Sequence, residues 1–212
     1  MLHCVVWPER YTQSSVEAIE IMPGKQAKIL AVEHIDDLLL FAETTRHPHR
    51  NRVIVLLSAK AGLRAAEIAN LTWDMVRDPD GSIGSLIELR DSAAKMGHGR
   101  RIPLHPDLRI ALVALNGSGS GKDSVVRSTR GGRMTALSIV IWFSRAYRTL
   151  GLDGCSSHSG RRTFITRAAR LVHKAGGSLR DVQLLAGHQS IQTTQRYIDG
   201  DSDAQRRLVA LI

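Results

Sequence analysis

The 212-residue sequence has few of the features that define secreted, metal-binding or membrane proteins. It contains two cysteines, Cys4 and Cys155, which can form at most one bridge and are not accompanied by histidines at zinc-binding spacing. Its longest apolar runs, such as residues 29–32 and 53–57, are far too short to cross a bilayer, and the N-terminus lacks a basic segment followed by an apolar one. We therefore expect a soluble protein of the reducing cytoplasm, with neither a disulfide framework nor a metal site.

Acidic residues are scarce in one part of the sequence. The whole chain has 29 Lys and Arg against 20 Asp and Glu, a formal net charge of +9. Residues 121–180 hold 12 basic and 2 acidic residues, whereas residues 1–120 hold 14 of each and residues 181–212 hold 3 basic and 4 acidic ones. The excess therefore lies within one stretch. Such a block indicates either a surface that binds a polyanion, nucleic acid above all, or a solvated basic face, and the charge alone leaves both open.

Length and local pattern predict one domain preceded by a short arm. Residues 1–24 are irregular and end in the breaker pair Pro23 and Gly24, so we expect an N-terminal arm followed by a single domain over residues 25–212. Helical spacing of apolar residues predicts a first helix after this arm. A buried helix, a break at Gly62 and a further helix from about Arg64 are expected to follow.

The pattern changes between Met75 and Leu104. Two short runs, "SLIELR" and "RRIPL", have a strand-like composition and are separated by a turn-rich segment, so we expect a small antiparallel hairpin or three-stranded sheet. Beyond Pro106 helices are predicted over residues 108–115, 137–151, 160–176, 179–188, 193–198 and 203–212. The expected fold class is therefore mainly α (α+β), with one small antiparallel β-sheet.

The segment "SSHSGRRTF" places two basic side chains at the start of a predicted helix. His158 and Arg161 are three residues apart, and Ser156 or Ser157 is available as the N-cap, so both basic side chains can point the same way from a helix end that attracts anions. This arrangement is either an anion site or a surface helix with incidental basic residues. Gly160 in the first turn loses about 1 kcal/mol of helix propensity relative to alanine unless another backbone must approach closely.

Two further basic residues lie beside turns. Arg64 follows the Gly62 break, and Glu67 comes three residues later. This spacing favours either an ordinary surface ion pair or a carboxylate that orients the guanidinium group to grip a phosphate. Lys95 lies in the turn between the two expected strands, where a lysine either increases solubility or reaches into a DNA groove.

These fragments, taken in order, resemble the catalytic domain of the tyrosine recombinases, the phage-integrase family of DNA breaking and rejoining enzymes. The first arginine box of that family is similar to "AGLRAAEI", its hairpin lysine to Lys95, its His-x-x-Arg box to "HSGR" and its final box to "LLAGHQSIQTTQRYI". The last fragment contains His188 and Tyr197, one of three tyrosines in the chain. Each fragment is a weak signal alone, but their joint order is specific. The resemblance covers the chain from about Gln26 to the C-terminus.

The resemblance implies a mechanism for these side chains. Tyr197 would attack a scissile phosphodiester, form a 3′-phosphotyrosine and release a 5′-hydroxyl. Arg64 and Arg161 would neutralise the non-bridging oxygens, where charge changes most, and His188 would donate a further hydrogen bond. Fixed cations would thus replace the metal ions of other phosphoryl-transfer sites, so no metal or other cofactor is expected.

Three other residues complete the implied site. Lys95 would protonate the departing 5′-oxygen, His158 would help to move the tyrosine proton, and Glu67 would orient an arginine. The glycine of "HSGR" stands where leucine is common in the family, and this difference should affect packing more than chemistry.

The resemblance also implies a partner and an assembly. The partner would be double-stranded DNA, bound by a homo-tetramer in a cytoplasmic, nucleoid-associated location without membrane contact. Family members usually carry a further N-terminal helical domain that closes around DNA, and the expected arm is too short for it. The expected function is site-specific recombination or integration. The alternatives are a DNA-binding module of the same family that occupies sites without completing recombination, and a type IB topoisomerase-like activity.

Overall fold

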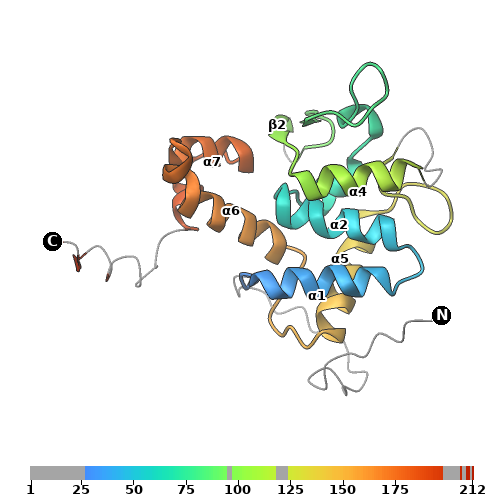
Figure 1. The fold of residues 1–212 in the computed structure, drawn as a ribbon, viewed down its shortest axis with the longest axis horizontal. Coiled ribbons are helices and arrows are strands. Elements are labelled where there is room, and N and C mark those ends of the chain that lie inside the picture. The colour runs from blue at the N-terminus through green and yellow to red at the C-terminus, as the bar shows by residue number, and fades with distance from the viewer. Residues whose placement is uncertain (1–26, 95–96, 118–123, 198–205, 207–208, 211) are drawn as a thin grey trace.

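The computed structural model describes residues 27–94, 97–117, 124–197, 206, 209–210 and 212. Its elements are α1 (Val32–Glu43), α2 (Pro48–Lys60), α3 (Ala65–Asn70), η2 (Trp73–Met75), β1 (Leu86–Leu89), β2 (Arg100–Pro103), α4 (Pro106–Gly117), α5 (Ala136–Thr149), α6 (Ser159–Leu171), η4 (Val172–Ala175), α7 (Leu179–Ala186) and α8 (Ile191–Gln195). This mainly helical fold with one small antiparallel sheet confirms the predicted fold class (Figure 1). The expected arm over residues 1–24, most of the helix predicted over 203–212, and Lys95 lie outside the described residues.

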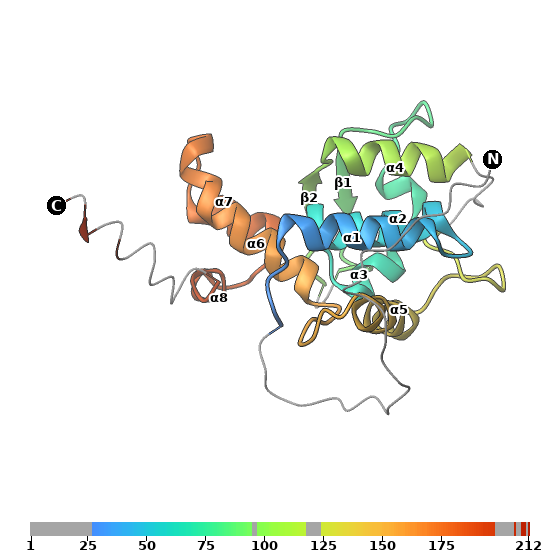
Figure 2. The same cartoon turned by 60° about the horizontal axis from the view of Figure 1, so that its bottom comes forward.

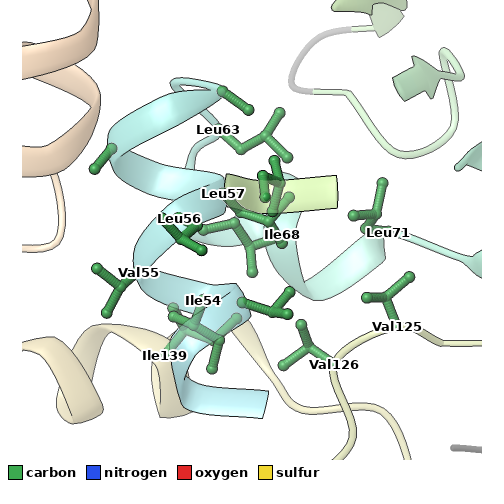
Figure 3. Close-up of a cluster of buried hydrophobic side chains, with 14 of the residues drawn as sticks. Ile54, Val55, Leu56, Leu57, Leu63, Ile68, Leu71, Val125, Val126 and Ile139 are labelled. Carbon is green, nitrogen blue, oxygen red and sulfur yellow. The ribbon is translucent and has the colours of Figure 1, made fainter. Parts of the chain in front are cut away.

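Helix α2 lies in the middle of the main hydrophobic core. Helices α1, α4 and α6 all pack against it, and the side chains of residues 53–57 are at most 1% exposed. A helix covered on several sides is apolar around its circumference, which explains the continuous apolar run in this segment. Figure 3 shows Leu57 of α2 close to Ile68 of α3. Ile139 of α5 belongs to the same cluster.

The predicted hairpin is confirmed, with β1 paired antiparallel to β2. The alternative of a three-stranded sheet is not found in the part of the chain that the structure describes, where Arg77 and Ile83 form an isolated bridge. Successive side chains of a strand point to opposite faces. Accordingly, Ile102 is buried on the same face as Arg100, whereas Arg101 is exposed on the other. Strand β2 therefore directs one of its two arginines into the protein.

Helices α6, α7 and α8 gather at one end of the molecule, as Figure 2 shows. A second, smaller cluster of buried side chains joins α6 to α7. The first turn of α6 packs against α2, where a Cβ atom added to Gly160 would lie 2.4 Å from Oγ of Ser58. The glycine therefore permits the close approach that its position in the sequence indicates. In the part of the chain that the structure describes, no helix has both the length and the apolar character needed to span a membrane.

Candidate active site

The turn after α2 presents Arg64. Gly62 has a φ of +65°, in the left-handed region that glycine adopts easily, and Arg64 is then the N-cap residue of α3. The carboxylate of Glu67 accepts hydrogen bonds from the backbone N–H of Arg64 at 2.9 Å and from its Nη1 at 2.8 Å. It accepts two more from Arg100, whose Nη1 lies at 3.1 Å and whose Nη2 lies at 2.9 Å. The Arg64–Glu67 pair is therefore part of an internal network and not an isolated surface ion pair.

Glu67 is ionised within this network. Its side chain is fully buried, and burial by itself would raise the pKa of the carboxyl group. The hydrogen bonds and charge of Arg100, followed by those of Arg64, outweigh the burial and lower the pKa of Glu67 to about 2. Because two arginines share one carboxylate, the cluster keeps a net positive charge.

Arg161 is buried at the start of α6, with 4% of its surface exposed. Its Nη1 donates to the carbonyl oxygen of Gly62 at 2.5 Å, and its Nη2 donates to that of Ala186 at 2.7 Å. Burial, and then the charge of Arg64, lower the pKa of Arg161 to about 10, so the side chain remains a cation at neutral pH. The carbonyl groups of Gly62, just after α2, and of Ala186, at the end of α7, thus hold this guanidinium group in place.

Helix α6 begins one residue before the predicted start at residue 160. It starts at Ser159 with His158 as its N-cap residue, so the prediction that Ser156 or Ser157 fills this position is wrong. The carbonyl oxygen of His158 accepts the first helical hydrogen bond, from the N–H of Arg162 at 2.9 Å, whereas Oγ of Ser156 accepts from the N–H of His158 at 3.3 Å, before the helix begins. His158 is exposed, and it lines the same pocket as Arg161.

His188 is neutral and its ring is held from both sides. Burial, followed by the charges of Arg161 and Arg64, lowers the pKa of His188 to about 4. Its Nε2 lies 3.1 Å from Nη2 of Arg161, and its Nδ1 lies 2.9 Å from Oγ1 of the buried Thr194. Since a guanidinium group only donates, Nε2 accepts from Arg161 and Nδ1 carries the proton that is donated to Thr194. In this structure the lone pair of Nε2 therefore orients Arg161.

Tyr197 lies just beyond α8. The helix predicted over residues 193–198 instead covers Ile191–Gln195, and the N–H of Tyr197 donates to Thr194 three residues back, at 3.1 Å, as in a turn. A chain that tightens to this spacing no longer follows the α-helix, which explains the shorter element. The ring of Tyr197 stacks on that of His188, with centroids 5.5 Å apart and an angle of 23° between the planes.

One pocket of about 340 Å³ brings most of the predicted residues together. It is lined by Ala27, Arg64, His158, Arg161, Arg162, His188, Thr193, Arg196 and Tyr197. Five of the six predicted catalytic residues are in this set, although they come from α3, α6 and the segments after α7 and α8. The sixth, Lys95, lies outside the described residues. Glu67 does not line the pocket and contacts it through Arg64.

Besides Ala27 and Thr193, which line the pocket, four residues of the site were not predicted from the sequence. Arg162 and Arg196 line the pocket, Thr194 contacts His188, and Arg100 binds Glu67. The sequence could have indicated Arg162 and Arg196, because each is adjacent to a predicted site residue. It could also have indicated Arg100, because residues two apart in a strand point to the same face and Ile102 is apolar. Within the described residues, no group of three or more His, Cys, Asp or Glu side chains is arranged to hold a metal ion.

The chain is similar to known proteins over most of its length. The family model described as the phage integrase family matches residues 28–203. Tyrosine recombinase XerC of Brucella suis biovar 1 is 28% identical over 158 residues, which cover 72% of this chain and 47% of the relative. Tyrosine recombinase XerA of Thermococcus kodakarensis is 28% identical over 180 residues, which cover 83% of this chain and 59% of the relative. The chain spans about half the length of the curated relatives it matches.

Solved structures share the fold. A crystal structure of XerA recombinase has a TM-score of 0.69 with this chain at 23% identity, covering 89% of this chain and 66% of its own. The XerH site-specific recombinase bound to a palindromic difH substrate has a TM-score of 0.68 at 19% identity, covering 88% of this chain and 53% of its own. At this level of identity the likeness shows a common fold.

Proposed function

Because this chain belongs to the phage integrase family, we propose that residues 25–212 form a catalytic domain that cleaves and rejoins double-stranded DNA at specific sites through a 3′-phosphotyrosine. The observation that supports this most directly is the pocket that contains Tyr197 together with Arg64, Arg161 and two further arginines. Among the described residues that line it, none is acidic. A phosphodiester inserted there would therefore meet positive charge from several side chains.

In the proposed cleavage step, the phenolic oxygen of Tyr197 attacks the phosphorus atom and the bond from phosphorus to the 5′-oxygen breaks. The phenolic proton passes to His158 or to water, and Lys95 supplies a proton to the departing 5′-oxygen. Arg64 and Arg161 neutralise the charge on the non-bridging oxygens throughout. One phosphodiester is exchanged for another, so no nucleotide cofactor is consumed.

Rejoining is the reverse step. A 5′-hydroxyl, from the same strand or from a second duplex, attacks the phosphotyrosine and releases Tyr197. Exchange between two duplexes requires two cuts in each, and therefore a homo-tetramer on DNA. The excess of basic residues over 121–180 also supports the proposal, because these side chains would bind DNA phosphates and release counterions.

The test uses the full chain and a nicked duplex that contains the sequence it binds best in a randomised DNA library. The nick lets the cleaved fragment diffuse away and so traps the covalent adduct. We expect a protein–DNA adduct that survives denaturation and is absent in Tyr197→Phe, which should still bind the duplex. Tyr147→Phe is the matched control, since it removes a hydroxyl group that is buried outside the pocket and has no hydrogen-bond partner among the described residues.

The other outcomes separate the alternatives. Binding without an adduct would support the DNA-binding module. Relaxation of a supercoiled plasmid without exchange between sites would support a topoisomerase-like activity. An adduct that persists in Tyr197→Phe would contradict the assigned nucleophile.

A further inference from the structure

Strand β2 contributes a buried arginine that lies outside the pocket. The side chain of Arg100 is 6% exposed, and it is not among the residues that line the pocket. Its two terminal nitrogens bind the two oxygens of Glu67, and its Nε donates to the carbonyl oxygen of Leu185 at 2.9 Å. All three guanidinium nitrogens therefore bond to the protein, at residues that do not line the pocket with Tyr197.

The two partners of Arg100 are connected to different parts of the site. Glu67 binds Arg64 through both its side chain and its backbone. Leu185 is in the last turn of α7, whose C-cap residue, Gly187, immediately precedes His188. One guanidinium group thus joins the segment that presents Arg64 to the segment that presents His188.

The fit around Arg100 is tight at Gly187. This glycine has a φ of +62°, and a Cβ atom added to it would lie 2.9 Å from Nη1 of Arg100 and 3.2 Å from its Cζ. The turn that leads into His188 therefore packs directly on the guanidinium group. The same turn requires glycine for its backbone conformation.

Positive charge in this region exceeds what the folded chain neutralises. Arg64 and Arg100 share the carboxylate of Glu67, and the charge of Arg161 interacts with all three groups. Arg100 and Arg161 are almost completely buried. Compared with apolar residues of the same volume, a buried ion pair is a weak source of stability, although removing one partner is costly because it leaves a buried charge unpaired. Such an arrangement is better explained by a site that must present cations in fixed positions to an anion.

We propose that Arg100 is a positioning residue, which holds Glu67 with Arg64 on one side and the turn before His188 on the other in the geometry that receives the scissile phosphate. This rests on the proposed function. Arg100 does not touch the phosphate itself. A lysine could retain the charge but could not bind both oxygens of Glu67 and the carbonyl group of Leu185 from one planar group.

The experiment compares Arg100→Met and Arg100→Lys with Arg101→Met. Arg101 is the neighbouring arginine on the same strand, with an exposed side chain paired to Glu88, so it is a matched control. Each full-length protein is given the nicked duplex with either a normal scissile phosphodiester or a methylphosphonate, in which a methyl group replaces one non-bridging oxygen and removes the charge. The rate of adduct formation at saturating protein, the affinity for the duplex and the melting temperature are measured.

We expect both Arg100 variants to cleave the phosphodiester about 100-fold more slowly, the order of effect that a displacement of about 1 Å produces in an active site. The affinity of the Arg100 variants for the duplex should stay within about 3-fold of the wild type, because Arg100 does not line the pocket. The cleavage rate of Arg101→Met at saturating protein should stay within the same range, because the side chain of Arg101 pairs with Glu88 and not with Glu67. On the methylphosphonate, where Arg64 has less charge to neutralise, the defect should shrink to less than about 10-fold.

Two results would overturn the inference. One is a rate for Arg100→Met equal to that of the wild type, and the other is an equal loss on both substrates together with a lower melting temperature, which indicates a merely structural role. If Arg100→Met does not fold, the comparison rests on Arg100→Lys. Absence of an adduct with the wild-type chain would instead refute the proposed function, and the inference would fail with it.

Discussion

Replacing Glu67 by glutamine tests the buried network at the base of the pocket. Glutamine has nearly the same shape but no charge, so it mimics a protonated Glu67. Each unit of pKa difference between folded and unfolded chain corresponds to about 1.36 kcal/mol. The pKa of Glu67 falls from its usual 4.5 to about 2 on folding, so ionised Glu67 should contribute about 3 kcal/mol to the free energy of unfolding.

The sign of the pH dependence follows from the direction of this change. Since the pKa is lower in the folded chain, the contribution is fully present above the unfolded pKa of 4.5 and is lost as the pH falls toward about 2. We expect Glu67→Gln to be less stable than the wild type by about 3 kcal/mol near pH 7 and by about 2 kcal/mol near pH 3.5. Other carboxylates also titrate over this range, but they cancel in the difference between the two proteins.

Urea denaturation of both proteins at the two pH values measures these differences. Glu88→Gln is the control, because Glu88 is an exposed carboxylate paired with Arg101 across the hairpin, and its loss should change the free energy of unfolding by less than about 1 kcal/mol. A Glu67→Gln protein within about 1 kcal/mol of the wild type near pH 7 would refute the reasoning, as the buried arginines would then not depend on this carboxylate. A difference that stays the same at both pH values would refute the assigned pKa.

Three further predictions concern the packing and the site. Gly160→Ala should destabilise the chain by about 1–3 kcal/mol through its contact with Ser58, and adding Ser58→Ala should recover part of the loss in melting temperature. Thr194→Val should slow adduct formation about 10-fold, because it removes the acceptor for Nδ1 of His188, and it should leave DNA affinity unchanged. The logarithm of DNA affinity should fall linearly with the logarithm of salt concentration, with a slope near −0.9 per phosphate neutralised. Arg162→Gln should reduce the steepness of that slope by about 0.9, because Arg162 lines the pocket. An affinity that does not change with salt would contradict binding through phosphate contacts.

Much of the fold could be predicted because burial leaves a local pattern. The apolar run of α2 indicates a helix covered on several sides, and the alternation in β1 and β2 indicates a hairpin. The glycine break at Gly62 marks the turn that presents Arg64. Helix boundaries were predicted less well. The helix predicted over 160–176 ends at Leu171, and the one predicted over 193–198 covers Ile191–Gln195, because a boundary depends on one or two hydrogen bonds that leave little trace in the sequence.

By itself the sequence determined the candidate side chains of the site and the order in which they occur. The resemblance of its fragments, taken in order, to the tyrosine recombinases is what points to Arg64, Arg161, His188 and Tyr197, since each fragment alone is a weak signal. What the tertiary structure alone decided is how they are held. Arg161 binds the carbonyl group of a residue 99 positions away, and Arg100 binds a carboxylate 33 positions away.

Adjacent arginines illustrate the physical reason. Arg100 and Arg101 are the same residue type in the same strand, yet one is buried against Glu67 and the other is exposed beside Glu88. Strand alternation indicates which one points inward, but a partner that is distant in sequence leaves no mark on local periodicity. The partner becomes defined only when α3, β2 and the end of α7 pack together and exclude water from the charges between them.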